Sequence, residues 1–318
     1  MPSTMVFAMS NRIEIFKGAL AIVLSSFLWG TTGTAASYVP TINSLAIGAF
    51  AMGIAGVLLV FTARKKLLAD YKRMIAYPKM LVLGGISVAI YPLAFYTSMR
   101  FAGVAIGTVV SIASAPFFSA MLDRLISKKS VSLQWVVSFL IGAIGIVFLA
   151  VGKDQHTFIT NSLFLQNIGI LLGLLAGLTY ACYAWVAKQL IDGSVHSQSA
   201  MAGLFGIAAL LLLPSLLLTG QNIFSSVTNI SVSMYMAIIP MFFGYLLFGF
   251  GLKFIDASRA TLITLIEPLV ATILAVYIVG EKLQVVGWIG MGLVSLCLLM
   301  QTFKIEILSK VNAIEVQR

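Results

Sequence analysis

A run of about twenty apolar residues between Arg259 and Glu281 limits what this chain can fold into more than any other feature. A bilayer core of ~30 Å is crossed by ~20 helical residues that rise ~1.5 Å each, so the run predicts a transmembrane helix. Only the pair Glu267-Pro268 interrupts it. Proline gives no N–H to the helical ladder, and a charged carboxylate facing lipid costs roughly 2.5–3.5 kcal/mol. The pair therefore predicts a broken helix whose acid faces the protein interior or a wet cavity.

Composition extends this interpretation to the whole chain. Of 318 residues, 60% are hydrophobic and only 9% are charged, whereas about 25% of the residues in a soluble domain are charged. A formal charge of +10 is compatible with nucleic-acid binding, but the Lys and Arg residues lie in short gaps between apolar runs rather than on one polar surface. We therefore expect a lipid bilayer around the chain and no nucleic-acid partner.

Hydropathy predicts ten membrane-spanning helices, separated by connections too short for a soluble domain. The first apolar run resembles a cleavable signal at its start, but it is long for a signal and is interpreted as a span. Five prolines fall inside the spans, which is typical of a channel or transporter with broken helices. The predicted spans are roughly 18–39, 43–62, 80–99, 102–126, 132–151, 166–187, 199–219, 232–252, 258–279 and 284–303.

The basic residues predict how the spans are oriented. With the N-terminus placed in the cytoplasm, seventeen of the twenty Lys and Arg residues fall on the cytoplasmic side, and only Arg100, Lys153 and Lys282 fall on the other. Short cytoplasmic loops of membrane proteins are enriched in Lys and Arg. We expect a multi-pass protein of the cytoplasmic (inner) membrane with both termini cytoplasmic.

The two halves of the chain form a weak repeat. A shift of about 151–152 residues places Gly18-Ala19-Leu20 on Gly169-Ile170-Leu171 and Pro116 on Pro268. Each half has five spans, an odd number, so the second half inserts upside down relative to the first. The predicted fold class is an all-α membrane protein with ten transmembrane helices in two inverted five-helix repeats, an architecture typical of alternating-access transporters.

This repeat predicts how the chain is divided. The expected parts are a cytoplasmic N-terminal segment (1–17), a first repeat (18–151), a connector (152–165), a second repeat (166–303) and a cytoplasmic tail (304–318).

Several short motifs carry a resemblance to a known family. They are Leu28-Trp29-Gly30 in the first span, Ala257-Ser258-Arg259-Ala260 leading into Ile266-Glu267-Pro268, and then Gly280-Glu281-Lys282. With these motifs the chain resembles the ten-span drug/metabolite transporter superfamily, in the branch called EamA, over about 18–151 and 169–303. The resemblance implies export or import of small metabolites, amino acids among them. In the first half Ala115 precedes the matching proline, so any acidic role falls on the second half.

Glu267 is the only carboxylate well inside a span. One interpretation is a proton carrier or a counter-charge for a cationic group on the substrate. The other is a protonated carboxyl that bonds a backbone carbonyl freed by the nearby kink. Glu281, at the outer membrane surface, also has two interpretations. It is either a gate, or it caps the start of the tenth helix or pairs with Lys282.

Aromatic residues within the spans suggest the wall of a passage. Tyr180 and Tyr183 border a stripe of small residues on the sixth span, and Trp29 aligns with Tyr180 in the repeat. Tyr91 and Tyr96 place hydroxyl groups in the third span, where they need polar partners. Packing between helices is the alternative for all of them. The candidate substrate pathway is Trp29, Tyr91, Tyr96, Tyr180, Tyr183 and Glu267.

Missing motifs narrow the function. The sequence has no nucleotide-binding loop and no clustered acid, base or nucleophile, so we expect no enzyme activity and no cofactor. His156 and His196 fall on opposite sides of the membrane and cannot share a metal. We expect a secondary transporter that exports a small polar metabolite, an amino acid or a related solute, with protons as the candidate coupling ion. The alternatives are efflux of lipophilic cations and a membrane-embedded protein without transport activity.

Overall fold

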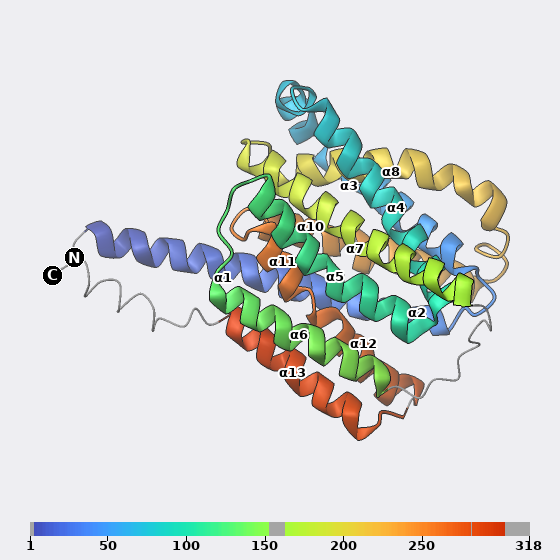
Figure 1. The fold of residues 1–318 in the computed structure, drawn as a ribbon. Helices are drawn as coiled ribbons and strands as arrows, with labels where there is room; N and C mark the ends of the chain where they lie inside the picture. The colour runs from blue at the N-terminus through green and yellow to red at the C-terminus, as the bar shows by residue number, and fades with distance from the viewer. Residues whose placement is uncertain (1–2, 153–162, 281, 303–318) are drawn as a thin grey trace.

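The computed structural model describes residues 3–152, 163–280 and 282–302, and the chain forms a bundle of long helices (Figure 1). Among the described residues, nine helical segments are long and apolar enough to cross a membrane, and a tenth apolar helix is shorter. This confirms the all-α, ten-span fold class. The first half contains α1 (Ser3–Gly30), α2 (Thr32–Ser37), α3 (Ser44–Ile75), α4 (Pro78–Ala102), α5 (Val104–Leu125) and α6 (Leu133–Val151).

The second half has more breaks in its helices. The eighth span joins α9, a π-helical turn η1 and α10, and the ninth joins α11, α12 and a second π-helical turn η2. The elements are α7 (Leu163–Asp192), α8 (Ser197–Thr219), α9 (Val227–Met236), η1 (Ala237–Phe243), α10 (Gly244–Gly251), α11 (Ala257–Ile263), α12 (Ile266–Leu274), η2 (Ala275–Val279) and α13 (Val285–Thr302).

The prolines break fewer helices than the sequence suggests. Pro92, Pro116 and Pro214 lie inside continuous α-helices, whereas Pro240 lies in η1. In the ninth span α11 ends one turn before Pro268. The expectation of broken helices is therefore wrong for three of the five proline-containing spans, because a helix within a bundle tolerates a proline when its neighbours hold it straight.

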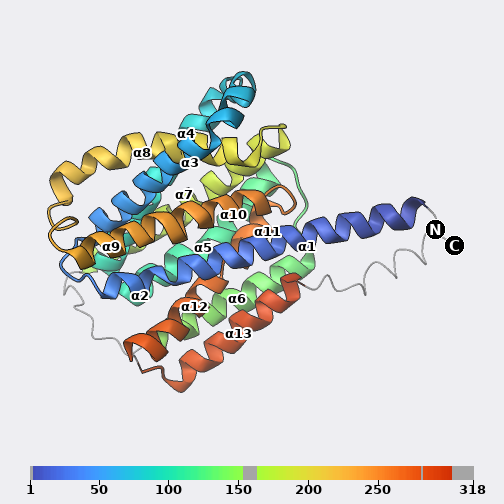
Figure 2. The same cartoon turned by 180° about the vertical axis from the view of Figure 1, so that it is seen from behind.

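The most extensive contacts between helices are symmetric: where two helices pack together in this way, their counterparts in the other half also pack together. α3 packs on its counterpart α8, and α6 packs on its counterpart α13. α4 packs on α7 as α10 packs on α1, and α5 packs on α7 as α12 packs on α1. Figure 2 shows α1 lying alongside α10 on one side, with α6 and α13 at one edge of the bundle. The contacts are those of two repeats related by a twofold axis.

The loops lie on two opposite faces, at the two ends of α3. At one end the Asp70 carboxylate accepts the backbone N–H of His196 at 2.9 Å. At the other end the Asn222 side chain donates to the backbone carbonyl of Thr41 at 2.8 Å. The connection after α3 and its counterpart after α8 therefore lie on opposite faces, which is the inverted arrangement. We call the face that carries Asp70 the basic face.

Glycines on α7 bring the two repeats into close contact. A Cβ at Gly169 would lie 2.5 Å from the backbone nitrogen of Ala102, and one at Gly173 would lie 2.9 Å from Ser98 Oγ. The Ser98 hydroxyl donates to the Gly169 carbonyl at 2.7 Å. Small residues let helix backbones approach in this way. The close contact places the tyrosines farther along α7 beside α4.

Candidate functional site

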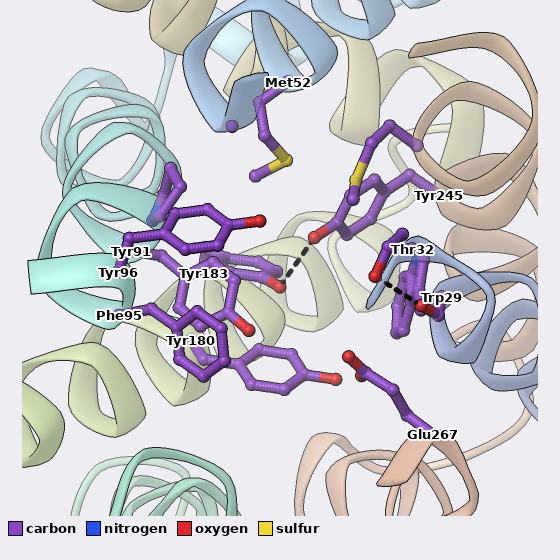
Figure 3. Close-up of a pocket in the computed structure, with 13 residues that line it drawn as sticks. Trp29, Thr32, Met52, Tyr91, Phe95, Tyr96, Tyr180, Tyr183, Tyr245 and Glu267 are labelled. Carbon is purple, nitrogen blue, oxygen red and sulfur yellow. Dashed lines mark hydrogen bonds between the residues drawn. The ribbon is translucent and has the colours of Figure 1, made fainter. Parts of the chain in front are cut away.

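A cavity lies between the two repeats, near the middle of the spans (Figure 3). Its lining residues surround about 540 Å³ of empty space, a volume that includes space open to the surroundings. Eight of its thirteen lining residues come from the first half and five from the second. They are Trp29, Thr32, Gly48, Met52, Tyr91, Pro92, Phe95 and Tyr96, and then Tyr180, Tyr183, Met241, Tyr245 and Glu267.

The structure brings all six predicted pathway residues together at this cavity. Trp29 comes from α1, Tyr91 and Tyr96 from α4, Tyr180 and Tyr183 from α7, and Glu267 from α12. Glu281, the gate or cap candidate, lies outside the described residues.

Few of the other lining residues are indicated by the sequence. Tyr245 is a tyrosine within an apolar span, as Tyr180 is, and a weaker form of the same argument applies to it. Met52 and Gly48 have no such signal. Gly48 makes room for an aromatic neighbour, because a Cβ there would lie 2.7 Å from the Tyr96 ring.

The position of Glu267 follows from the proline beside it. A helical residue at position 268 would donate its N–H to the Thr264 carbonyl, but proline has none. The Thr264 carbonyl instead accepts the backbone N–H of Glu267 at 2.9 Å. The helix therefore restarts at Ile266, and Glu267 occupies the first turn of α12.

The Glu267 side chain points into the cavity (Figure 3). Within the part of the chain that the structure describes, its carboxylate forms no hydrogen bond or ion pair. The alternative of a carboxyl bonded to a freed backbone carbonyl is not what the structure shows, since the backbone itself satisfies the Thr264 carbonyl. A carboxylate without a protein partner is open to a solute or a proton.

Aromatic rings form a nearly continuous wall around this carboxylate. The Tyr180 and Tyr183 rings stack with centroids 5.2 Å apart, and the Tyr91 ring lies 5.4 Å from that of Tyr180. On the other side the Trp29 ring lies 4.8 Å from the Tyr245 ring. Ring faces carry partial negative charge and attract cations.

Some of the tyrosine hydroxyls already have partners. Tyr180 donates to Thr264 Oγ1 at 3.0 Å, and the Tyr183 and Tyr245 hydroxyls lie 3.2 Å apart. The hydroxyls of Tyr91 and Tyr96 also belong to the cavity lining. The site therefore combines one carboxylate, hydroxyl groups and ring faces.

The cavity is closed toward the basic face. Tyr183 and Tyr245 lie in the halves of their spans nearer this face, whereas Thr32 and Gly48 lie nearer the opposite face. Beyond the tyrosine pair, the buried Phe205 ring contacts the Tyr245 and Tyr183 rings at centroid distances of 4.2 and 6.2 Å. These three rings form the floor of the cavity.

Charged contacts at the basic face join the repeats beyond this floor. Lys129, from the loop after α5, bonds Asp256 at 2.6 Å and approaches Asp192 at 3.4 Å. Partial burial disfavours the Lys129 ammonium, but these bonds and the nearby carboxylates raise its pKa. The Asp123 carboxylate accepts the backbone N–H of Ser258 at 3.1 Å. The loop after α5 is thus tied to the end of α7 and the start of α11.

The described residues contain no group of three or more His, Cys, Asp or Glu side chains that could hold a metal ion. Of the two histidines, His196 caps α8, where its Nδ1 accepts the backbone N–H of Gln198 at 3.2 Å. His156 lies outside the described residues.

Comparisons with known proteins agree with this architecture. Residues 16–151 and 167–303 each match the EamA-like transporter family. YwfM of Bacillus subtilis (strain 168), named an uncharacterized transporter, is 30% identical over 285 residues, which cover 88% of this chain and 92% of YwfM. YicL of Salmonella typhimurium (strain LT2), named an uncharacterized inner membrane transporter, is 22% identical over 86% of this chain and 91% of YicL.

A solved crystal structure shares the fold. It superposes with a TM-score of 0.72 at 15% sequence identity, over 89% of this chain and 94% of the other. At this identity the likeness concerns the fold alone, whereas the sequence matches extend through both repeats and nearly the whole length of YwfM. The chain therefore belongs to the EamA-like transporter family and is a multi-pass membrane transporter.

Proposed function

We propose that the protein is a secondary transporter that exports a small amphiphilic metabolite, of about the size of an amino acid, across the inner membrane by alternating access. One observation carries the proposal: the cavity lies between the repeats, and both repeats line it. Transporters built from inverted repeats bind their solutes near mid-membrane, where the repeats meet. Relative motion of the repeats would change which face the cavity opens to.

We place the basic face in the cytoplasm, because most of the Lys and Arg residues fall on that side. In this orientation the rings of Phe205, Tyr183 and Tyr245 lie between the cavity and the cytoplasm. Loading from the cytoplasm would then require the rings of Tyr183 and Tyr245 to separate, together with the contacts of Lys129.

Glu267 is our candidate for the coupling group, because its carboxylate lines the cavity without a hydrogen-bond or ion-pair partner among the described residues. Glu267→Gln keeps the shape and removes the titratable group. If protons are coupled, uptake driven by a pH gradient into liposomes will fall to the level of protein-free liposomes. Glu14→Gln, at an exposed carboxylate of α1, is the matched control. Unchanged uptake with a normal pH profile in the Glu267 variant would remove the coupling role.

Two classes of solute suit the lining of the cavity. Amino acids and related metabolites are the first class, and lipophilic cations are the second, which the aromatic wall and the single carboxylate favour. Comparing metabolites inside and outside cells with and without the gene, and the drug resistance of the same strains, would separate the classes. Movement of a labelled solute into liposomes without chemical change would exclude a membrane-embedded enzyme.

A further inference from the structure

We infer that the solute carries a protonated amino group and no free carboxylate when it occupies the cavity. The class is an amine, or an amino-acid amide or ester, rather than a free amino acid. The inference rests on the proposed transport function and names the substrate class of the same site.

The first observation is the charge of the lining. Among the thirteen described residues that line the cavity, Glu267 is the single acid, and none is Lys, Arg or His. Seven of the thirteen are aromatic. Their ring faces present partial negative charge, as the carboxylate presents full charge. A cation is complemented from several sides in such a site, and an anion is not.

The second observation is that the groups which could receive a solute carboxylate are already occupied or out of reach. The Trp29 indole N–H has no hydrogen-bond partner among the described residues, but it is buried against Gly244, where an added Cβ would be 2.6 Å from Nε1. The Tyr180 hydroxyl donates to Thr264. The first turn of α12, whose helix dipole would attract an anion, already contains the Glu267 carboxylate.

Among the described residues that line the cavity none is basic, and Lys129 cannot take this role in the observed conformation. Lys129 lies beyond the floor of the cavity and is bonded to Asp256 and Asp192. The cavity hydroxyls of Tyr91 and Tyr96 can donate, but they carry no charge. A zwitterion would therefore place its carboxylate without a cationic partner whether Glu267 is ionised or protonated. A charge that leaves bulk water without gaining a partner is strongly disfavoured.

The test compares solutes that differ in charge but share one ring. The probes are L-phenylalanine amide, 2-phenylethylamine, L-phenylalanine and 3-phenylpropionate, and the full-length protein is held in lipid nanodiscs at about pH 6, below the α-amino pKa of ~7.7–8.0. Equilibrium dialysis gives each dissociation constant. We expect the amide and the amine to bind at least tenfold more tightly than phenylalanine, and phenylpropionate to bind most weakly.

Two variants show whether the preference comes from the cavity. Glu267→Gln should weaken binding of the amide by about tenfold or more while its thermal unfolding stays close to that of the wild type, and Glu14→Gln should bind the amide like the wild type. Phenylalanine binding as tightly as its amide would overturn the inference, and so would binding of none of the four probes.

Counterflow into liposomes separates this inference from the proposed function. Tight binding of the amide without any movement across the bilayer would support the charge class and contradict transport. Movement of phenylalanine but not of its amide would support transport and contradict the charge class.

Discussion

At the scale of single residues, Glu267 owes its exposure to the cavity to the proline that follows it. The missing N–H of Pro268 leaves the Thr264 carbonyl to bond the backbone of Glu267. Thr264 in turn accepts the hydroxyl of Tyr180 from α7. A side chain from α7 therefore contacts the break in the ninth span. Tyr180 and Glu267, the two residues with the sharpest functional predictions, both hydrogen-bond to Thr264.

Two substitutions of Tyr180 can separate its role in helix packing from a contact with the solute. Tyr180→Phe removes only the hydrogen bond to Thr264 Oγ1, which is worth about 1 kcal/mol of unfolding free energy. Tyr180→Ala also removes a buried ring, at a cost of about 3–5 kcal/mol. We expect the Phe variant to keep most of its affinity for the solute and the Ala variant to weaken it at least tenfold while still inserting into the membrane.

Unfolding in mixed detergent and solute binding measure the two effects on the same preparations. Unaltered affinity in Tyr180→Ala would assign this residue to packing alone.

At the scale of elements, the break between α11 and α12 sets the geometry of the site. Pro268→Ala restores an N–H that can compete for the Thr264 carbonyl, so α11 and α12 can join into one helix. We expect thermal stability to stay the same or rise, by up to about 3 kcal/mol, while transport is lost because Glu267 turns away from the cavity. Pro214→Ala is the control, since that proline already lies in a continuous helix. Full transport by the Pro268 variant would show that the break is not required.

The loop after α5 is the second element with a testable role. Lys129→Gln removes both contacts with the carboxylates of Asp256 and Asp192 and keeps the side-chain length. Partly exposed ion pairs contribute ~0–1 kcal/mol each, so the population open to the basic face should rise by up to about thirty-fold. Faster amide hydrogen exchange over residues 127–131 would report this. Lys128→Gln, at the exposed neighbour, should leave the exchange unchanged.

At the scale of the whole molecule, the inverted repeat fixes which loops share a face. In a variant without Cys182 and Cys297, a single cysteine at Gln221 should react with a membrane-impermeant maleimide added to intact cells. One at Lys72 should react only after the cells are permeabilised. Both positions are exposed, so access depends on the side of the membrane. Labelling of both from the same side would contradict the inverted arrangement, and the reverse pattern would contradict cytoplasmic termini.

The sequence by itself determined the ten spans, the inverted halves and the presence of an acid beside a helix break. These features are local or additive. Span length follows from bilayer thickness, inversion follows from an odd number of spans, and a carboxylate within a span must avoid lipid. For the same reason the sequence identified Glu267 and the tyrosines on the sixth span as interior residues.

Only the tertiary structure decided which other residues complete the cavity and which face is closed. Nearly uniform apolar spans do not reveal which side of each helix faces lipid, so Met52 and Gly48 could not be assigned before the helices were packed. The continuous helices through Pro92, Pro116 and Pro214 likewise depend on their neighbours. Closure toward the basic face comes from contacts between side chains far apart in the chain, which only packing brings together.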